Sequence, residues 1–142
     1  MSKLAQPNGD DFPEAADKLV DDSAILHGGN RHDGAAYLAG YVVECCLKTI
    51  LLLETKTTWG HHLTNLTTEI SRLYSIAGTK TAKYASAPAV KQLPASPVIQ
   101  WNPDMRYRSA GSVSPAAAAI WVHDAKAVYD ATIVEMRLDG VI

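Results

Sequence analysis

The amino-acid sequence predicts an all-α protein, folded as an up-and-down antiparallel bundle of four to five helices. Apolar side chains recur three and four residues apart in four separate segments, which is the helical period. No segment alternates apolar and polar residues as a half-buried strand does, and no internal repeat is present. The chain has 142 residues and is 47% hydrophobic, which is enough for one core. We therefore expect a single domain over residues 11–142, behind a polar, disordered N-terminus at residues 1–10.

The first helix is expected to begin at Pro13, because the fixed φ of proline suits the first helical turn. Glu14 and Asp17 follow, and carboxylates favour the positive end of the helix dipole. Apolar residues between positions 19 and 26 then form a stripe along one side. The Gly28-Gly29 pair ends the helix, since glycine readily takes the backbone conformations that follow a helix.

Two further helices are expected in the middle of the chain. The second runs from about Asp33, a candidate N-cap, to about Glu54, and it contains no proline and many apolar residues. The third runs from about His62 to Ile76, with leucines and an isoleucine at helical spacing, and Gly78 ends it. The density of apolar residues predicts that the second helix lies at the centre of the bundle.

The rest of the chain divides into a loop and a final helix. Four prolines interrupt residues 79–114, so this segment is expected to be irregular, with at most a short helix around residues 81–92. The last helix is marked by Ser114 as N-cap and Pro115 as its first residue, and it should continue to about Leu138.

Charge is unevenly distributed, although the net charge is only −2. Residues 1–30 hold six acidic and two basic residues, whereas residues 78–108 hold five basic residues and one acidic residue, a local charge of +4. Such a stretch is either a solvated loop or a surface that meets a phosphate. The overall charge gives no global field that points to nucleic acid or to a membrane.

The apolar residues 35–53 are long enough to cross a bilayer. Glu44 and Lys48 lie near the middle of this stretch, and each costs about 2.5–3.5 kcal/mol at the centre of a membrane. A buried helix in a cytoplasmic protein, without a membrane partner, is therefore expected. The adjacent Cys45 and Cys46 point about 100° apart on a helix, so they suit packing rather than a disulfide. No Cys/His spacing typical of a metal site occurs, and no cofactor motif is present.

A single polar line crosses the second helix at spacings of four, three and four residues. Its members are Tyr37, Tyr41, Glu44 and Lys48. Because the rest of this helix is apolar, we expect Glu44 to be buried and paired, with Lys48 one turn away and with Arg106 or His62 as further partners. The line is either a structural ion-pair network that locks the helices together, or part of a site for a ligand or partner.

Three segments resemble a known family in order and spacing. The run AYLAGYVVECCLK at 36–48 resembles the second helix of bacterial HEPN domains, which ends in E-x-x-L-K. GHHLTNL at 60–66 resembles the G-H-x-L-x-x-L opening of their next helix. WNPDMRY at 101–107 resembles their later W-x-x-x-x-R-Y segment. HEPN domains are the nucleotide-binding helical domains of higher eukaryotes and prokaryotes, and the three segments cover about half of this chain.

The resemblance implies an antiparallel helical bundle, often dimeric, that is associated with nucleotides or RNA. Members of the family include toxin ribonucleases and the partners of nucleotidyltransferases. The ribonucleases carry an R-x(4–6)-H motif, and no arginine of this chain has a histidine five to seven residues later. The resemblance therefore implies a non-catalytic nucleotide-binding, RNA-binding or protein-interaction module, with a cognate nucleotidyltransferase or an antitoxin as expected partner proteins.

Candidate ligand-binding residues gather in the basic segment and at the start of the third helix. They are Arg106, Arg108, Trp101, Tyr107 and His62. Arginine offers a fork of donors to phosphate, and Trp101 either stacks on a base or anchors the loop to the bundle. A divergent ribonuclease would combine Arg106 or Arg108 with His61, His62 or His123 as general base. A purely structural dimer is the third alternative.

The last helix predicts a two-fold homodimer. Small residues between positions 116 and 131 would let another helix approach closely, and apolar residues occupy more than one of its faces. His123 is expected to belong to the core or to this interface, while His27 and His32 flank a turn and are expected to face solvent.

Overall fold

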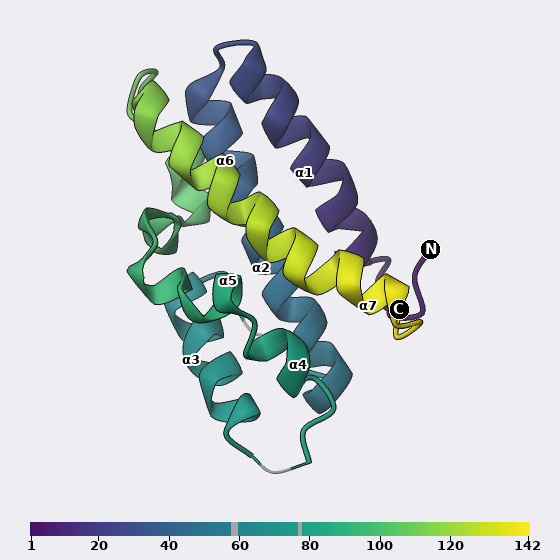
Figure 1. Cartoon of the computed structure of the whole chain (residues 1–142). Helices are drawn as coiled ribbons and strands as arrows, with labels where there is room; N and C mark the ends of the chain where they lie inside the picture. Colours follow the sequence, from purple (N-terminus) through teal and green to yellow (C-terminus); the bar gives the residue numbers. More distant parts are fainter. Residues whose placement is uncertain (58–59, 77) are drawn as a thin grey trace.

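The computed structural model describes residues 1–57, 60–76 and 78–142 (Figure 1). Within these residues every regular element is helical and no strand is present, which confirms the all-α prediction. The four long helices are α1 (Phe12–Gly28), α2 (His32–Thr55), α3 (Leu63–Tyr74) and α6 (Pro115–Tyr129). The shorter elements are α4 (Ala82–Ala85), α5 (Pro88–Lys91), η1 (Leu93–Ala95), η2 (Pro97–Gln100), η3 (Pro103–Tyr107), η4 (Asp130–Val134) and α7 (Glu135–Leu138).

Helices α1 and α2 lie side by side and are joined by a tight turn, with α6 lying obliquely across them (Figure 1). The Asp11 carboxylate caps α1 by accepting a hydrogen bond from the backbone N–H of Glu14, and Pro13 lies in the first turn as predicted. Asn30 has a φ of 60° in the turn after α1. Ser23 of α1 donates to the carbonyl oxygen of Ala35 at 2.9 Å, which ties the two helices together.

Helix α2 is the centre of the bundle, as its composition predicts. Every residue from Val42 to Leu52 is buried. The helix is long and apolar enough to cross a membrane by length and composition alone, but 78% of its most apolar stretch is buried inside the protein. Cys45 and Cys46 are buried free thiols, which confirms that they serve packing rather than a bridge.

The expected N-cap of α2 is wrong. Arg31 occupies that position without a capping side chain, and Asp33 lies within the first turn. The Asp33 carboxylate instead accepts hydrogen bonds from the backbone N–H groups of Gly111 at 2.6 Å and Val113 at 2.8 Å. These two bonds hold the pKa of Asp33 below its usual value. Asp33 therefore fixes the turn that precedes α6, where Gly111 has a φ of 82°.

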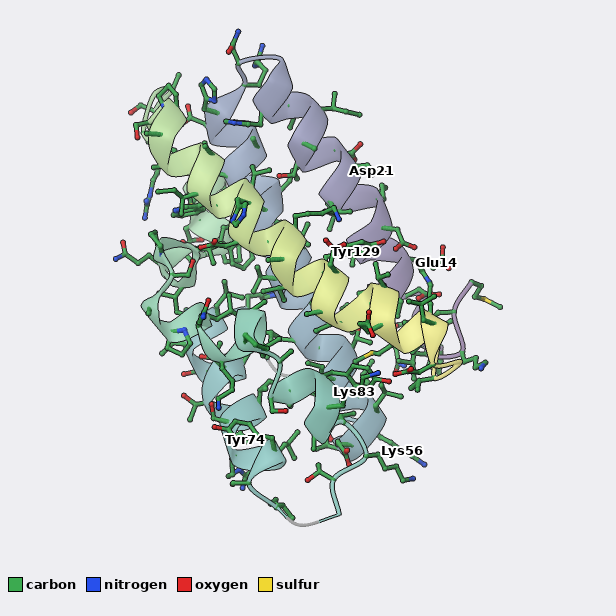
Figure 2. The ribbon with its side chains drawn as sticks, viewed as in Figure 1. Glu14, Asp21, Lys56, Tyr74, Lys83 and Tyr129 are labelled. Atoms are coloured by element: carbon green, nitrogen blue, oxygen red, sulfur yellow. The ribbon has the colours of Figure 1, made fainter. Side chains whose placement is uncertain are left out.

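The last helix begins as predicted but is not uninterrupted. Ser114 caps α6 by accepting from Ala117 N–H at 3.1 Å. The α-helix gives way to the π-helical stretch η4 before α7. Figure 2 shows Tyr129 where the C-terminal helix meets α1, and its hydroxyl donates to Asp17 at 2.7 Å. Arg137 also donates to Asp17, so this carboxylate connects α1 with the C-terminal helical segment.

Residues 79–114 are more ordered than their prolines suggest. They contain two short α-helices and three 3₁₀ turns, where the sequence predicts at most one short helix. Proline begins most of these turns, because its missing N–H is not needed in the first turn. Thr81 starts the segment by donating its N–H and its hydroxyl to Glu54 at 2.6 and 2.8 Å.

The first ten residues form turns beside α1. Ser2 donates its N–H and its hydroxyl to Asp11, both at 2.7 Å, and Lys3 donates to the carbonyl oxygen of Gly140 at 2.7 Å. The disorder expected for this segment stays a prediction.

Candidate functional site

Three segments that are far apart in the sequence line one groove of about 830 Å³. Tyr41 comes from α2, residues 60–64 belong to the loop before α3 and its first turn, and residues 99–104 with Arg106 belong to the segment before α6. A groove of this size lies within the usual range for small-molecule sites. Of the candidate residues from the sequence, it brings together Tyr41, Trp101, His62 and Arg106.

Trp101 holds the loop against α2. Its indole N–H donates to the carbonyl oxygen of Tyr37 at 2.9 Å, and its ring packs edge-to-face with Tyr41 at 4.6 Å between centroids. The side chain lies on Gly40, where an added Cβ would come within 2.0 Å of two indole carbons. Trp101 is only 2% exposed. It therefore anchors the loop to the bundle, the second of the two expected alternatives, and offers little surface on which a base could stack.

The two tyrosines of the polar line meet the cation of the loop. Their hydroxyls lie 3.2 Å apart, and Arg106 Nη1 donates to the Tyr37 hydroxyl at 3.4 Å. Burial, followed by the hydrogen bond with Tyr37, raises the pKa of Tyr41 to about 12. The Tyr41 hydroxyl is therefore a neutral hydrogen-bonding group at the edge of the groove, and Arg106 supplies the positive charge.

Glu44 and Lys48 form the buried part of the polar line. Their side chains meet at 2.7 Å between Lys48 Nζ and Glu44 Oε1, and the residues are only 3% and 5% exposed. The ammonium also lies 5.2 Å from the centre of the Phe12 ring. The prediction that Glu44 is buried and paired with a cation is confirmed.

The further partner of Glu44 is His61, neither Arg106 nor His62. The imidazole Nδ1 of His61 lies 2.8 Å from Glu44 Oε1, the same oxygen that forms the ion pair with Lys48. Arg106 is turned toward Tyr37 instead, and His62 is the exposed N-cap of α3. The expected partners were wrong because helix periodicity determines which residues share a face of α2 but does not determine how the preceding loop presents two adjacent histidines.

The second carboxylate oxygen of Glu44 has an unusual environment. Oε2 is buried and has no hydrogen-bond partner among the described residues. Buried carboxylate oxygens are ordinarily satisfied, because an unmade hydrogen bond to a charged group is costly. Glu44 is thus bound firmly through one oxygen, beneath a histidine that is 59% exposed in the groove.

Tyr107 and Arg108 lie outside the groove. The Tyr107 ring is 78% exposed and has the Arg106 guanidinium 5.0 Å from its centre. Arg108 is exposed and makes no side-chain hydrogen bond or ion pair with the described residues. The structure thus separates the Arg106-Tyr107-Arg108 element into one cation that faces the groove and one that faces solvent.

The other three histidines are only partly as the sequence predicts. His123 is exposed and contacts Asp124 at 3.2 Å, so it does not lie in the core, while its alternative place in a dimer interface stays a prediction. His27 and His32 are half-buried rather than solvent-exposed, with their Nδ1 atoms 3.3 Å apart. Over the described ranges, no group of three or more His, Cys, Asp or Glu side chains could hold a metal ion.

Two residues of the site have signals in the sequence. His61 directly follows Gly60 at a helix start, as a partner of the buried carboxylate would, but the sequence does not distinguish it from the adjacent His62. Gly40 interrupts an apolar helix, where glycine usually costs stability, so its presence already indicates a close approach by another group. The approaching group, Trp101, lies 61 positions later and could not be identified from spacing.

No protein-family model, curated protein or solved structure matches this chain. The resemblance of three short segments to HEPN domains therefore remains the ground for a family hypothesis. What the structure adds is the location of these segments, since residues 36–48, 60–66 and 101–107 are the ones that supply the groove with Tyr41, the two histidines and Arg106.

Proposed function

We propose that this protein is a non-catalytic, HEPN-like binding module that takes a phosphate-bearing ligand, a nucleotide or RNA, in the groove. The observation that carries the proposal is the meeting of the three HEPN-like segments at one groove, which Arg106, His61 and His62 line together. Residues that bind one ligand must lie close together in space. The three segments that resemble HEPN domains each supply at least one residue to the groove.

The start of α3 supports a phosphate as the group that is bound. Leu63 and Thr64, the first residues of this helix, line the groove. Helix N-termini present free backbone N–H groups and a partial positive charge to an anion. His62 at the N-cap makes no side-chain capping bond that would occupy these donors. Arg106 adds a guanidinium, which suits the geometry of phosphate oxygens.

Titration with AMP, ATP and a short single-stranded RNA by calorimetry tests the proposal. Arg106→Ala should weaken binding at least about tenfold, as loss of a charged hydrogen bond predicts. Arg108→Ala should weaken it less, since Arg108 acts only through its charge. Lys18→Ala, which removes an exposed cation on α1, is the matched control. Equal affinities for the wild type and the Arg106 variant would exclude the groove as the binding site.

We further propose the HEPN-like up-and-down arrangement and a two-fold dimer through α6. Helix α6 leaves Ala116 and Ala119 exposed and Ile120 47% exposed, which supports a helical contact at this face. A cognate nucleotidyltransferase or an antitoxin protein, both implied by the resemblance, are the proposed partners. Light scattering that gives the monomer mass at high micromolar concentration would contradict the dimer.

One observation favours a second candidate, a divergent ribonuclease. The Glu44 carboxylate orients His61, as carboxylates orient catalytic histidines, and Arg106 lines the same groove. His61 would take the proton of a 2′-hydroxyl, whose oxygen attacks the adjacent phosphorus while the bond to the 5′-oxygen breaks. The products are a 2′,3′-cyclic phosphate and a 5′-hydroxyl end that receives the proton.

Incubation of purified protein with mixed RNA distinguishes the two candidates. Cleavage with cyclic phosphate ends that is lost in His61→Gln would establish the ribonuclease. Intact RNA, or cleavage that persists unchanged in the variant, would leave the binding module as the proposed function.

A further inference from the structure

The two ring nitrogens of His61 lie in different environments. Nδ1 is 2.8 Å from the Glu44 carboxylate, which only accepts hydrogen bonds when ionised, so Nδ1 carries a hydrogen and donates. In the neutral ring, Nε2 must then hold a lone pair. This nitrogen has no partner among the described residues, and the ring lines the groove. A neutral His61 therefore offers the groove an acceptor, which cannot donate a hydrogen bond to an ionised phosphate oxygen.

Glu44 keeps the ring in this state because the carboxylate itself is held in place. Lys48 forms an ion pair with the same Oε1 at 2.7 Å, and the side chains of the pair are buried. The two opposite charges cancel beneath the groove. A proton added to His61 at Nε2 consequently brings an uncompensated positive charge, and a new donor, to the groove surface.

The groups that face His61 come from each element around it. Helix α2 supplies Glu44, Lys48 and Tyr41, the loop before α6 supplies Asp104 and Arg106, and His62 is the next residue. Carboxylates ordinarily titrate below pH 5, and lysine, arginine and tyrosine above pH 8. Among the types of side chain that line the groove, histidine is the one whose ordinary range lies between these limits.

We infer that the groove is a proton-coupled anion site, in which His61 takes up a proton when a phosphate or sulfate group binds. Protonated His61 donates from Nε2 to an anion oxygen, and Glu44 is the positioning residue that keeps Nδ1 as the other donor. The inference rests on the proposed function, since it assigns a regulation by pH to the same groove. His62, which has no carboxylate partner within the described residues, is the internal comparison.

Sulfate is a suitable probe, because it keeps the same charge between pH 5.5 and 7.5 while phosphate does not. Calorimetry with the full chain should show an affinity for sulfate that rises at least about fivefold from pH 7.5 to pH 5.5. Measurements at one pH in buffers of different ionisation enthalpy should show net proton uptake on binding. His61→Gln removes the ring that Glu44 orients and should remove most of both effects, whereas His62→Gln should retain most of them. Because His61 is more than half exposed, its replacement should leave the fold intact, and circular dichroism checks this.

Glu44→Gln provides a second test where the variant folds. The amide offers both a donor and an acceptor to Nδ1, so it no longer imposes the tautomer, and the pH dependence should become weaker. Binding to the wild type that is independent of pH, or a pH dependence that is undiminished in His61→Gln, would overturn the inference and leave the proposed function standing. No binding of sulfate, AMP or RNA at any pH would overturn the proposed function itself.

Discussion

The two charged regions that the sequence singles out end in opposite environments. On α2, Glu44 and Lys48 are almost fully buried and bind each other. In the basic segment before α6, Arg106 and Arg108 are exposed, and only Arg106 contacts the polar line, through Tyr37. Desolvation makes each buried charge depend on its partner, whereas an exposed charge keeps most of its hydration. Stability should therefore depend on the first region and ligand binding on the second.

The largest effect is expected at Glu44. Glu44→Ala leaves the buried Lys48 ammonium without its carboxylate, so the free energy of unfolding should fall by about 3–5 kcal/mol in urea denaturation. The double variant Glu44→Leu/Lys48→Met should recover most of this loss, because apolar residues of similar size can replace a buried pair. Glu69→Ala, which breaks a partly exposed pair with Arg72, is the matched control and should cost under about 1 kcal/mol. Equal losses for Glu44→Ala and Glu69→Ala would show that burial does not distinguish the two pairs.

The second largest effect is expected where the two regions touch, at Gly40. The added methyl of Gly40→Ala would overlap the Trp101 ring, so either the ring or α2 must shift, at a cost of about 1–3 kcal/mol. Tryptophan emission should move to longer wavelength if the ring leaves its buried position. In Gly34→Ala, on the same helix, the new methyl meets only the flexible end of Leu26 at 3.2 Å. Equal stability of the two variants would mean that the loop is not held by this contact.

The difference between the regions also explains how far the sequence could predict the structure. Helical period alone identified the long helices and the burial of Glu44, because it depends on residues three and four positions apart. The partners of these residues come from distant segments. Glu44 contacts His61 rather than the expected His62. Asp33 accepts a hydrogen bond from the backbone of Gly111 rather than capping its own helix. Such choices depend on the path of a loop, which is determined by tertiary packing.

The π-helical stretch inside the last helix shows a similar limit. The apolar pattern runs unbroken through residues 115–138, and the sequence predicts one continuous α-helix there. In the structure Thr132, within η4, donates its hydroxyl to the carbonyl oxygen of Val128 at 2.7 Å. A π-helical turn contains one more residue than an α-helical turn. It does not change the apolar composition of the segment, so the sequence pattern does not reveal it.

An intermediate effect, dependent on pH, is expected at Asp33. Its folded-state pKa is lowered by the hydrogen bonds from Gly111 and Val113, so its contribution to stability is present above the unfolded value of about 3.9 and is lost as pH falls toward the folded value. Asp33→Asn should cost about 1 kcal/mol at pH 7, the net value of one hydrogen bond, and should flatten the loss of stability below about pH 4. Urea denaturation at several pH values measures this. Asp21→Asn, at an exposed acid on α1 (Figure 2), should leave the pH profile unchanged.

The smallest effect on stability is expected at Arg106. This variant tests most directly whether the exposed basic segment contributes to binding but not to stability. From the sequence, Arg106 should bind Glu44, and its loss should then both unfold the protein and weaken ligand binding. In the structure Arg106 is exposed and makes one long hydrogen bond, 3.4 Å, to the Tyr37 hydroxyl. Arg106→Ala should therefore change the free energy of unfolding by no more than about 0.5 kcal/mol, as is usual for exposed positions, while anion affinity falls. Urea denaturation and calorimetry on the same preparation measure both quantities. A loss of stability comparable to that of Glu44→Ala would show that the buried pair and the exposed arginine form one network, and the division of stability and binding between the two regions would be wrong.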